Sequence, residues 1–166
     1  MLQGKCLCEG VRIEIDAPLG PVIACHCSLC RRSTGSAFNP NASVPAERFR
    51  ITSGQELVHE FSRVPGTCRA FCSRCGSPLY GRSDAYPTIM RVRLGTFDNT
   101  EGARPIAHIF TGSKADWFEI KDEAEQFDEW PTPDNRRARY FQSPLPCKLG
   151  WFVFQHIESR TNRRLR

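Results

Sequence analysis

Residues 25–30 read CHCSLC and residues 71–76 read FCSRCG, and these two stretches determine how the chain must fold. The first is a C-x-C-x-x-C motif, and the second contains a C-x-x-C motif followed by Gly76. Tetrahedral zinc binds thiolates at about 2.3 Å, which places neighbouring sulfurs roughly 3.8 Å apart. A C-x-x-C turn brings two sulfurs this close with little strain, and a glycine just past the turn tolerates a positive φ. The motifs therefore predict zinc sites.

A third motif, the C-x-C at residues 6–8, lies in the N-terminal segment MLQGKCLCEG. That segment lacks the apolar stretch of a secretory signal, so we expect a cytoplasmic, reducing environment. The chain has 166 residues and nine cysteines, an odd number that is unusual for a secreted disulfide scaffold. No run approaches the roughly 18 apolar residues of a membrane span. Clustered thiols in such a chain indicate metal ligands.

The three motifs supply seven thiolates, one fewer than two closed four-thiolate sites need. A structural zinc takes four protein ligands, whereas a catalytic zinc keeps three and leaves one position open. We therefore predict two zinc ions, with the open site formed by the single continuous segment. The predicted ligands are Cys25, Cys27 and Cys30 for the open, catalytic site, and Cys6, Cys8, Cys72 and Cys75 for the closed, structural site.

The spacing of the cysteines leaves other arrangements open. The C-x-x-C at residues 27–30 could combine with the C-x-x-C at residues 72–75 in a zinc-ribbon-like site. Cys68 could supply an eighth thiolate. His26 lies between two predicted ligands, but in an extended C-x-C its side chain points away from the cysteines, which favours a packed histidine.

The rest of the chain contains short stretches with the alternation of half-buried strands. In residues 10–16, for example, Val11, Ile13 and Ile15 fall on one face. Turn residues separate the other stretches. The expected strands are 10–16, 48–52, 57–61, 67–71, 89–94 and 106–110, and the expected short helices lie near 28–33 and 46–49. This pattern predicts a mainly β domain.

The net charge of +5 is distributed unevenly. Residues 134–166 carry eight basic and two acidic side chains, whereas the residues before them are close to neutral. A nucleic-acid footprint usually spreads over a folded face, so this distribution argues against a nucleic-acid partner for the main domain. Pro131 and Pro133 mark a boundary. We expect a zinc-binding catalytic domain at residues 1–133 and a basic C-terminal extension at residues 134–166.

Six stretches in a fixed order point to a known family. They are GKCLC (4–8), CHCSLCRRSTG (25–35), FRITSG (49–54), FCSRCGSPLY (71–80), LGTFDN (94–99) and PIAHIFTGSKADWFEI (105–120). Together they resemble the family of glutathione-dependent formaldehyde-activating enzyme and the centromere protein V domain, over about residues 4–131. Glu9 stands where a glycine commonly follows the C-x-C, and we expect the adjacent Gly10 to take that role.

The resemblance implies a zinc-stabilised, mainly β fold of short antiparallel strands with few short helices, like that of suppressor-of-Sec-four. It also implies the same division of ligands into a structural four and a catalytic three. The implied enzyme is a carbon–sulfur lyase that forms or cleaves S-(hydroxymethyl)glutathione. Its partners would be a glutathione-like thiol and an aldehyde, such as formaldehyde, without a membrane. An oligomer is compatible with the sequence.

An open three-thiolate zinc can hold an incoming thiol as the nucleophilic thiolate. Three thiolates on Zn²⁺ leave one net negative charge, so nearby cations should assist. We predict that Arg31 and Arg32 bind substrate through the carboxylates of a glutathione-like ligand, with Arg69 as a further candidate. The alternative function is a non-catalytic, zinc-stabilised binding module that contacts protein or chromatin through the basic extension.

Overall fold

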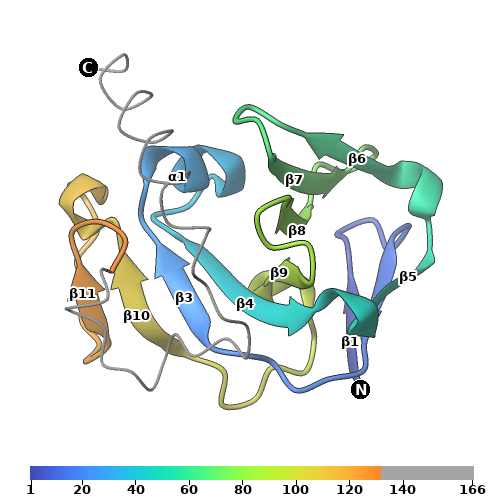
Figure 1. The fold of residues 1–166 in the computed structure, drawn as a ribbon, viewed down its shortest axis with the longest axis horizontal. Coiled ribbons are helices and arrows are strands. Elements are labelled where there is room, and N and C mark those ends of the chain that lie inside the picture. The colour runs from blue at the N-terminus through green and yellow to red at the C-terminus, as the bar shows by residue number, and fades with distance from the viewer. Residues whose placement is uncertain (132–166) are drawn as a thin grey trace.

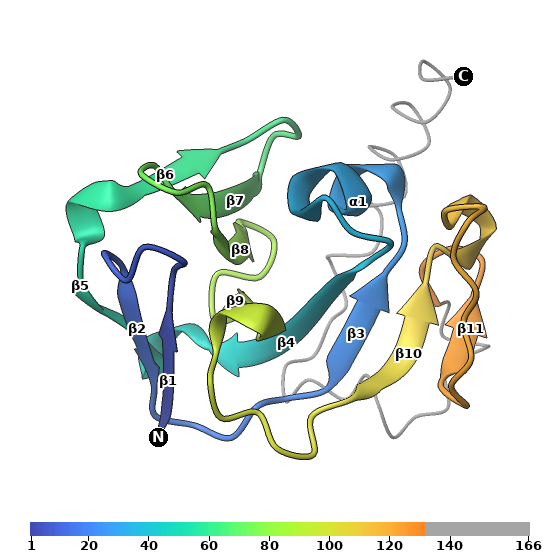
Figure 2. The same cartoon turned by 180° about the vertical axis from the view of Figure 1, so that it is seen from behind.

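The strands of residues 1–131, the part of the chain that the computed structural model describes, form two sheets (Figures 1 and 2). The strands are β1 (Leu2–Lys5), β2 (Arg12–Ile15), β3 (Val22–Cys25), β4 (Asn39–Pro45), β5 (Phe49–Ser53), β6 (Val58–Phe61), β7 (Thr67–Cys72), β8 (Pro78–Ser83), β9 (Ile89–Arg93), β10 (Pro105–Ile109) and β11 (Glu125–Phe127). The helix α1 spans Ser28–Thr34, and short 3-10 helices are η1 (Ala46–Arg48), η2 (Gln55–Leu57), η3 (Leu94–Thr96) and η4 (Thr111–Ser113).

The larger sheet has the strand order β11-β10-β3-β4-β9-β8-β7-β6, and the smaller has the order β1-β2-β5. Neighbouring strands run antiparallel except at β10, which is parallel to both β3 and β11. The prediction of a mainly β fold with short strands and few short helices is confirmed. The two parallel pairings are a detail of topology that alternation along the chain does not reveal.

The six expected strands correspond to β2, β5, β6, β7, β9 and β10, and the two expected helices correspond to α1 and η1. Five further strands were missed, and two of them are central. β3 lies between β10 and β4, and the sequence VIAC does not alternate because strands covered on both faces are apolar throughout. β4 has the sequence NPNASVP, whose prolines and asparagines are typical of a loop.

The apolar core joins the two sheets. Ile13 and Ile15 from β2 pack in one cluster with Val44 from β4, Leu79 from β8 and Val92 from β9, and all five side chains are buried. The alternation that predicted β2 therefore marks the face of the smaller sheet that packs against the larger one. Burial of each such side chain contributes about 1.5–3 kcal/mol.

Both C-x-x-C motifs come directly after strands of the larger sheet. Cys25 is the last residue of β3, and α1 begins three residues later at Ser28. Cys72 is the last residue of β7. Figure 2 shows α1 and the β7–β8 region at the same end of the molecule, with the strands β4 and β9 connecting them. The ends of two non-adjacent strands thus carry the predicted ligands.

The edge strand β6 is held to the sheet by the carboxylate of Glu60. Arg82 on β8 donates to both oxygens of this carboxylate, with Nη2 2.6 Å from Oε2, and the Tyr80 hydroxyl donates to Oε1 at 3.0 Å. The hydrogen bonds from Arg82 are the main reason that the pKa of Glu60 falls to about 2. The carboxylate therefore stabilises the fold only while it is ionised.

Replacing Glu60 with glutamine is expected to lower stability at pH 7 by about 1 kcal/mol, the size of a partly exposed ion pair, and the melting temperature by about 3 °C. The pKa is about 2 in the folded chain against an ordinary value of 4.5. The contribution is thus complete above about pH 4.5 and is lost as the pH falls toward 2. Melting curves of the two proteins should converge over that range, with Glu47→Gln as control. A difference in melting temperature between the two proteins that stays constant down to pH 3 would contradict a stabilising role for the ionised Glu60 carboxylate.

The predicted extension at residues 134–166, with Cys147, lies outside the described residues. The proposed domain boundary at residue 133 therefore stays a prediction. Within residues 1–131, α1 is too short to cross a membrane and no other helix is long and apolar enough to do so.

Candidate metal centres

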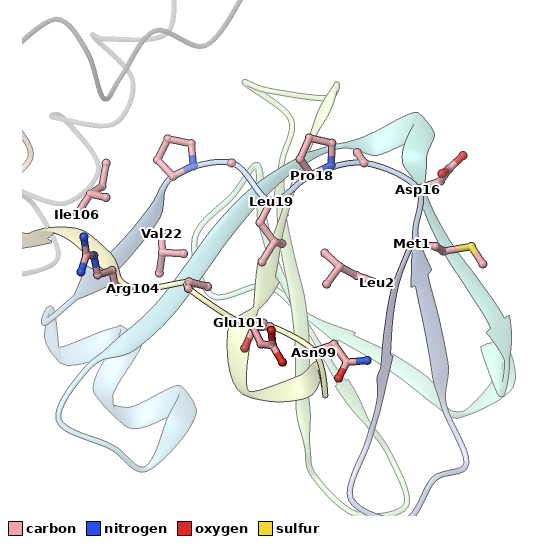
Figure 3. A pocket seen from close by; sticks show the side chains of 16 residues that line it. Met1, Leu2, Asp16, Pro18, Leu19, Val22, Asn99, Glu101, Arg104 and Ile106 are labelled. Atoms are coloured by element: carbon pink, nitrogen blue, oxygen red, sulfur yellow. The ribbon is translucent and has the colours of Figure 1, made fainter.

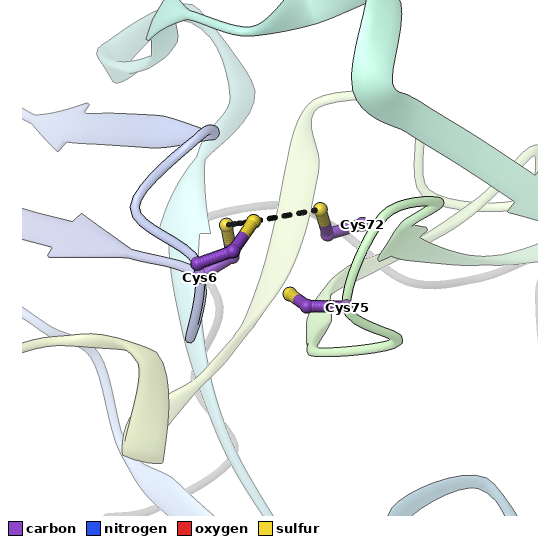
Figure 4. A group of neighbouring side chains, drawn as sticks. Cys6, Cys72 and Cys75 are labelled. Carbon is purple, nitrogen blue, oxygen red and sulfur yellow. Dashed lines mark hydrogen bonds between the residues drawn. The ribbon is translucent and has the colours of Figure 1, made fainter.

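Four cysteine sulfurs meet where the two sheets approach each other. Cys6 and Cys8 lie in the turn between β1 and β2, and Cys72 and Cys75 lie in the turn between β7 and β8 (Figure 4). The four sulfurs lie within 4.8 Å of one another. Cys8 Sγ is 3.8 Å from Cys72 Sγ, the separation expected for thiolates that share a tetrahedral zinc. These residues could hold one metal ion that ties the smaller sheet to the larger.

The two turns of this four-cysteine cluster place polar hydrogens around the sulfurs. The Ser77 hydroxyl lies 3.3 Å from Cys75 Sγ, and it lowers the pKa of the Cys75 thiol to about 5 together with the backbone N–H groups of Ser77 and Cys8. Gly76 has φ +75°, as the glycine after the motif predicted. The donors favour thiolate over thiol, which is the form that binds a metal.

The turn after Cys8 differs from the expectation for Gly10. Glu9 itself takes the left-handed conformation, with φ +57°, and its carboxylate lies 2.8 Å from Lys5 Nζ. Gly10 serves close packing instead, since an added Cβ would lie 2.7 Å from Leu57. A non-glycine residue in this conformation is destabilised by roughly 1 kcal/mol. The turn that carries Cys6 and Cys8 therefore contains local backbone strain at Glu9.

Three further cysteines form a second cluster at the end of β3. The sulfurs of Cys25, Cys27 and Cys30 lie within 4.8 Å of one another, and within residues 1–131 no other Cys, His, Asp or Glu belongs to this group. Cys27 is the N-cap of α1, with its Sγ 3.4 Å from the Cys30 backbone N–H. The C-x-x-C is therefore the first turn of a helix, which directs both sulfurs toward Cys25.

Without a cation, ionisation of one of the three thiols opposes ionisation of the others. Hydrogen bonds from Cys25 and Cys27 lower the pKa of Cys30 to about 2, while hydrogen bonds to Cys27 and Cys30 raise the pKa of Cys25 well above its ordinary value. One thiolate is thus stabilised by two S–H donors. A bound divalent cation removes the repulsion between three thiolates, so the donor set fits zinc.

The structure separates the two clusters and thereby decides between the arrangements left open by the spacing. The zinc-ribbon-like alternative is wrong, because residues 27–30 gather around Cys25 and residues 72–75 gather around the turn of residues 6–8. Cys68 belongs to neither group. Burial, followed by the neighbouring Glu60 carboxylate, raises the pKa of the Cys68 thiol to about 11. Cys68 is a buried neutral thiol.

Replacing Cys68 with serine is accordingly expected to leave the zinc content of the protein unchanged, because its sulfur lies in neither cluster. The side chain is buried, so exchange of sulfur for a smaller, more polar hydroxyl should lower stability by about 1 kcal/mol. Metal analysis of the purified protein and a thermal melt test both statements. Loss of a zinc equivalent in this variant would restore Cys68 as a ligand.

His26 points away from the cysteines on either side of it, as the strand geometry predicted. Its ring is buried, and its Nε2 lies 2.7 Å from His108 Nδ1 on β10. His108 Nε2 in turn lies 3.0 Å from an Asp122 carboxylate oxygen. Phe38 and Phe118 pack against the His26 ring, whereas Trp117 is 75% exposed. The hydrogen bonds from His26 through His108 to Asp122, together with the two phenylalanine rings, hold the three-cysteine segment against the sheet.

The predicted substrate-binding arginines have different surroundings. Arg31 donates through Nε to the His26 carbonyl at 3.2 Å and through Nη2 to the Ser113 carbonyl at 3.1 Å, so it ties α1 to η4. Arg32 is exposed on α1. Arg69 on β7 is half-buried and acts electrostatically on Cys30. A substrate-binding role for Arg31 and Arg32 stays a prediction.

Sequence reasoning missed three polar residues near the same sulfurs. Arg91 and Arg93 on β9 both act electrostatically on Cys25 and Cys30, and Asn39 is paired with Cys25 in the β3–β4 register. Burial lowers the pKa of Arg93 to about 10. No signal in the sequence identified them, because Arg91 and Arg93 are more than sixty positions from the motif and Asn39 lies in a segment whose prolines and asparagines are typical of a loop.

An open cavity of about 880 Å³ lies elsewhere in the described part of the chain, between the start of β1, residues 16–22 and residues 99–106 (Figure 3). Leu2 and Leu19 point into it, and Val22, Asp16 and Glu101 are among the other residues that line it. Its lining contains no cysteine or histidine. The cavity therefore has none of the metal-binding chemistry of the two clusters.

The fold and the two clusters define a mainly β domain with two candidate metal centres. A family model described as "Glutathione-dependent formaldehyde-activating enzyme" matches residues 1–113, and the chain belongs to this family. A Halomonas elongata protein named "Putative glutathione-dependent formaldehyde-activating enzyme" is 27% identical over 128 residues, which are 73% of this chain and 82% of that protein.

Other relatives match over shorter stretches. A Colletotrichum graminicola protein of the same name is 28% identical over 81 residues, which are 49% of this chain and 42% of that protein, so the match spans less than half of the fungal relative. A crystal structure of a Rhodobacter sphaeroides protein has a TM-score of 0.51 to this chain at 25% identity, and the match covers 62% of this chain and 91% of that one.

Proposed function

We propose that the chain is a zinc-dependent carbon–sulfur lyase that forms and cleaves S-(hydroxymethyl)glutathione. The observation that carries the proposal is the three-cysteine cluster of Cys25, Cys27 and Cys30, which comes from one segment and has no fourth ligand grouped with it among residues 1–131. Three protein ligands and one open position are the pattern of a catalytic zinc. The four-cysteine cluster has the closed pattern of a structural zinc.

Zinc at the three thiolates would lower the pKa of an incoming thiol and polarise the reacting groups. In the forward reaction the sulfur of glutathione forms a C–S bond with formaldehyde carbon. The thiol gives up its proton, the π electrons of the carbonyl move to oxygen, and this oxygen takes up a proton to become the hydroxyl of the hydroxymethyl group. The reverse reaction breaks the C–S bond and returns the proton to sulfur.

The residues around the cluster support this chemistry by position and charge. The chain of His26, His108 and Asp122 holds the segment that carries the sulfurs. The guanidinium groups of Arg69 and Arg93 act on Cys30, so they favour negative charge on sulfur and on a developing alkoxide. The closed four-cysteine cluster keeps the scaffold rigid without taking part in the reaction.

The test is the exchange rate between ¹³C-formaldehyde and its glutathione adduct, measured by NMR exchange spectroscopy because the adduct also forms spontaneously. We expect the protein, purified with two zinc ions, to raise the exchange rate above that of glutathione and formaldehyde alone. A protein that binds two zinc ions but does not raise the exchange rate would overturn the proposal that the chain is a lyase. A single tightly held zinc ion would favour the non-catalytic binding module.

A further inference from the structure

One face of the larger sheet carries a continuous set of polar side chains that begins at the three-cysteine cluster. Residues directly opposite each other in antiparallel strands point to the same face, as do residues two apart on one strand. The registers of β3, β4, β9, β8 and β7 therefore place one set of residues together. In order across the sheet these are Cys25, Asn39, Asn41, Arg93, Arg91, Gly81 and Arg69.

The central member of this polar face is Arg93. Its side chain is only 8% exposed, Nη1 donates to Asn41 Oδ1, and Nε has no hydrogen-bond partner among the described residues. An added Cβ at Gly81 would lie 3.1 Å from Arg93 Nη2, so the absence of a side chain there makes room for the guanidinium. The position of this buried charge thus depends on residues from three strands.

The arginines on the polar face have no carboxylate partner within residues 1–131. Arg69, Arg91 and Arg93 occur in none of the ion pairs of this part of the chain. Arg91 instead lies over the ring of Tyr86, with Cζ 5.6 Å from the ring centroid. Buried charges are ordinarily paired, because an unpaired one loses its solvation without compensation. The Cys25 and Cys30 sulfurs interact electrostatically with Arg91 and Arg93, and Arg69 interacts with Cys30.

Asn39 gives a second, independent indication of a ligand. Its side chain is 1% exposed, and neither Oδ1 nor Nδ2 has a hydrogen-bond partner among the described residues. A buried amide without partners is destabilising, and most such groups in proteins are satisfied. Asn39 lies directly opposite Cys25 in the β3–β4 register. A polar ligand beside the sulfurs would satisfy this amide.

The charges on the polar face indicate the kind of ligand. Three thiolates on one Zn²⁺ carry one net negative charge, whereas the three guanidinium groups carry three positive charges. A ligand that adds two negative charges would balance the site. A thiol that binds as thiolate supplies one of them, and a carboxylate in the same molecule supplies the other. Carboxylates are well matched to the planar donor set of arginine.

We propose that Asn39, Arg91 and Arg93 form an anion subsite that binds a carboxylate of the thiol whose sulfur occupies the three-cysteine cluster. The inference rests on the proposed function, since it requires a thiol at that position. It goes beyond that function because it makes these residues determinants of specificity for carboxylated over neutral thiols. The half-buried Arg69 adds positive charge at the far end of the subsite.

The test compares two small thiols that differ only in charge, 3-mercaptopropionate and 3-mercaptopropionamide, by calorimetric titration into the zinc-loaded full-length protein. We expect the acid to bind at least about tenfold more tightly than the amide, the size of one charge-assisted hydrogen bond. The variant Arg93→Met should lose this preference, because its affinity for the acid should fall by at least about tenfold more than its affinity for the amide. Arg50→Met, an exposed change in the smaller sheet, is the matched control.

A second variant covers the case in which Arg93→Met fails to fold. Asn39→Asp keeps the side-chain volume and adds a negative charge, so it should weaken binding of the acid at least about tenfold more than binding of the amide. Zinc content and a thermal melt confirm that each variant is intact. Equal binding of the two thiols by the unmodified protein, or an unchanged preference in Asn39→Asp, overturns the subsite alone. Binding of neither thiol overturns the proposed function as well.

Discussion

Replacing Cys72 with serine is expected to remove one zinc ion and to prevent the protein from reaching a stable native fold. The Cys72 sulfur is fully buried, and it connects the end of β7 to the turn between β1 and β2. Zinc binding to structural four-ligand sites contributes about 10–16 kcal/mol, which is comparable to the whole stability of a domain, about 5–15 kcal/mol. Loss of this site should therefore separate the two sheets.

The measurements are metal content, the fraction of soluble protein and the thermal melt. Cys68→Ser is the matched control, because it makes the same substitution on the same strand, outside both clusters. We expect the control to melt within a few degrees of the unmodified protein and Cys72→Ser to lose its cooperative transition. A Cys72→Ser protein that keeps its zinc and its melting temperature would show that the four-cysteine cluster is not a structural metal site.

Replacing Cys27 with serine is expected to have the opposite pattern: a folded protein without catalysis. Cys27 is the N-cap of α1, and serine is among the preferred N-cap residues, so the first turn of the helix should remain. We expect the melting temperature to change by no more than about 4 °C, the effect of about 1 kcal/mol in a domain of this size. One zinc ion should be lost.

The activity of Cys27→Ser should fall to the exchange rate of glutathione and formaldehyde without protein, because the three-cysteine cluster would retain only two sulfurs. The experiment combines metal analysis, a thermal melt and the NMR exchange assay on one preparation. If Cys27→Ser unfolds as Cys72→Ser is expected to, the three-cysteine cluster is structural and the lyase proposal is wrong. Full activity with a single zinc ion would contradict it equally.

Prediction from the sequence succeeded where the relevant geometry is local. Alternation of Val11, Ile13 and Ile15 identified β2 and its buried face, and the C-x-x-C spacing identified sulfurs that meet within one turn. Prediction failed for β3 and β4, which pair with each other at the middle of the larger sheet. A strand covered on both faces has no alternation, and prolines resemble loop signals even where the sheet accommodates them.

For the candidate site, too, the sequence predicted the local features and missed those that depend on the fold. The number and spacing of the cysteines predicted one group of three sulfurs and one of four but left a zinc-ribbon-like pairing open, and the structure brings together the sulfurs of the predicted groups. The arginine predictions named Arg31 and Arg32, with Arg69 as a further candidate, and a substrate-binding role for these residues stays a prediction. The structure adds that Arg31 donates to two backbone carbonyls and that Arg93, more than sixty positions from the motif, is a buried arginine that interacts electrostatically with Cys25 and Cys30.

The sequence by itself determined that this protein has a mainly β fold and cysteines in two groups suited to zinc, because strand alternation and thiol spacing act over a few residues. Only the tertiary structure decided which thiols meet across the two sheets and which polar groups stand beside the three-cysteine cluster. Asn39, Arg91 and Arg93 come together there through the order and register of β3, β4 and β9. Register depends on burial of the whole sheet, so no short stretch of the chain encodes it.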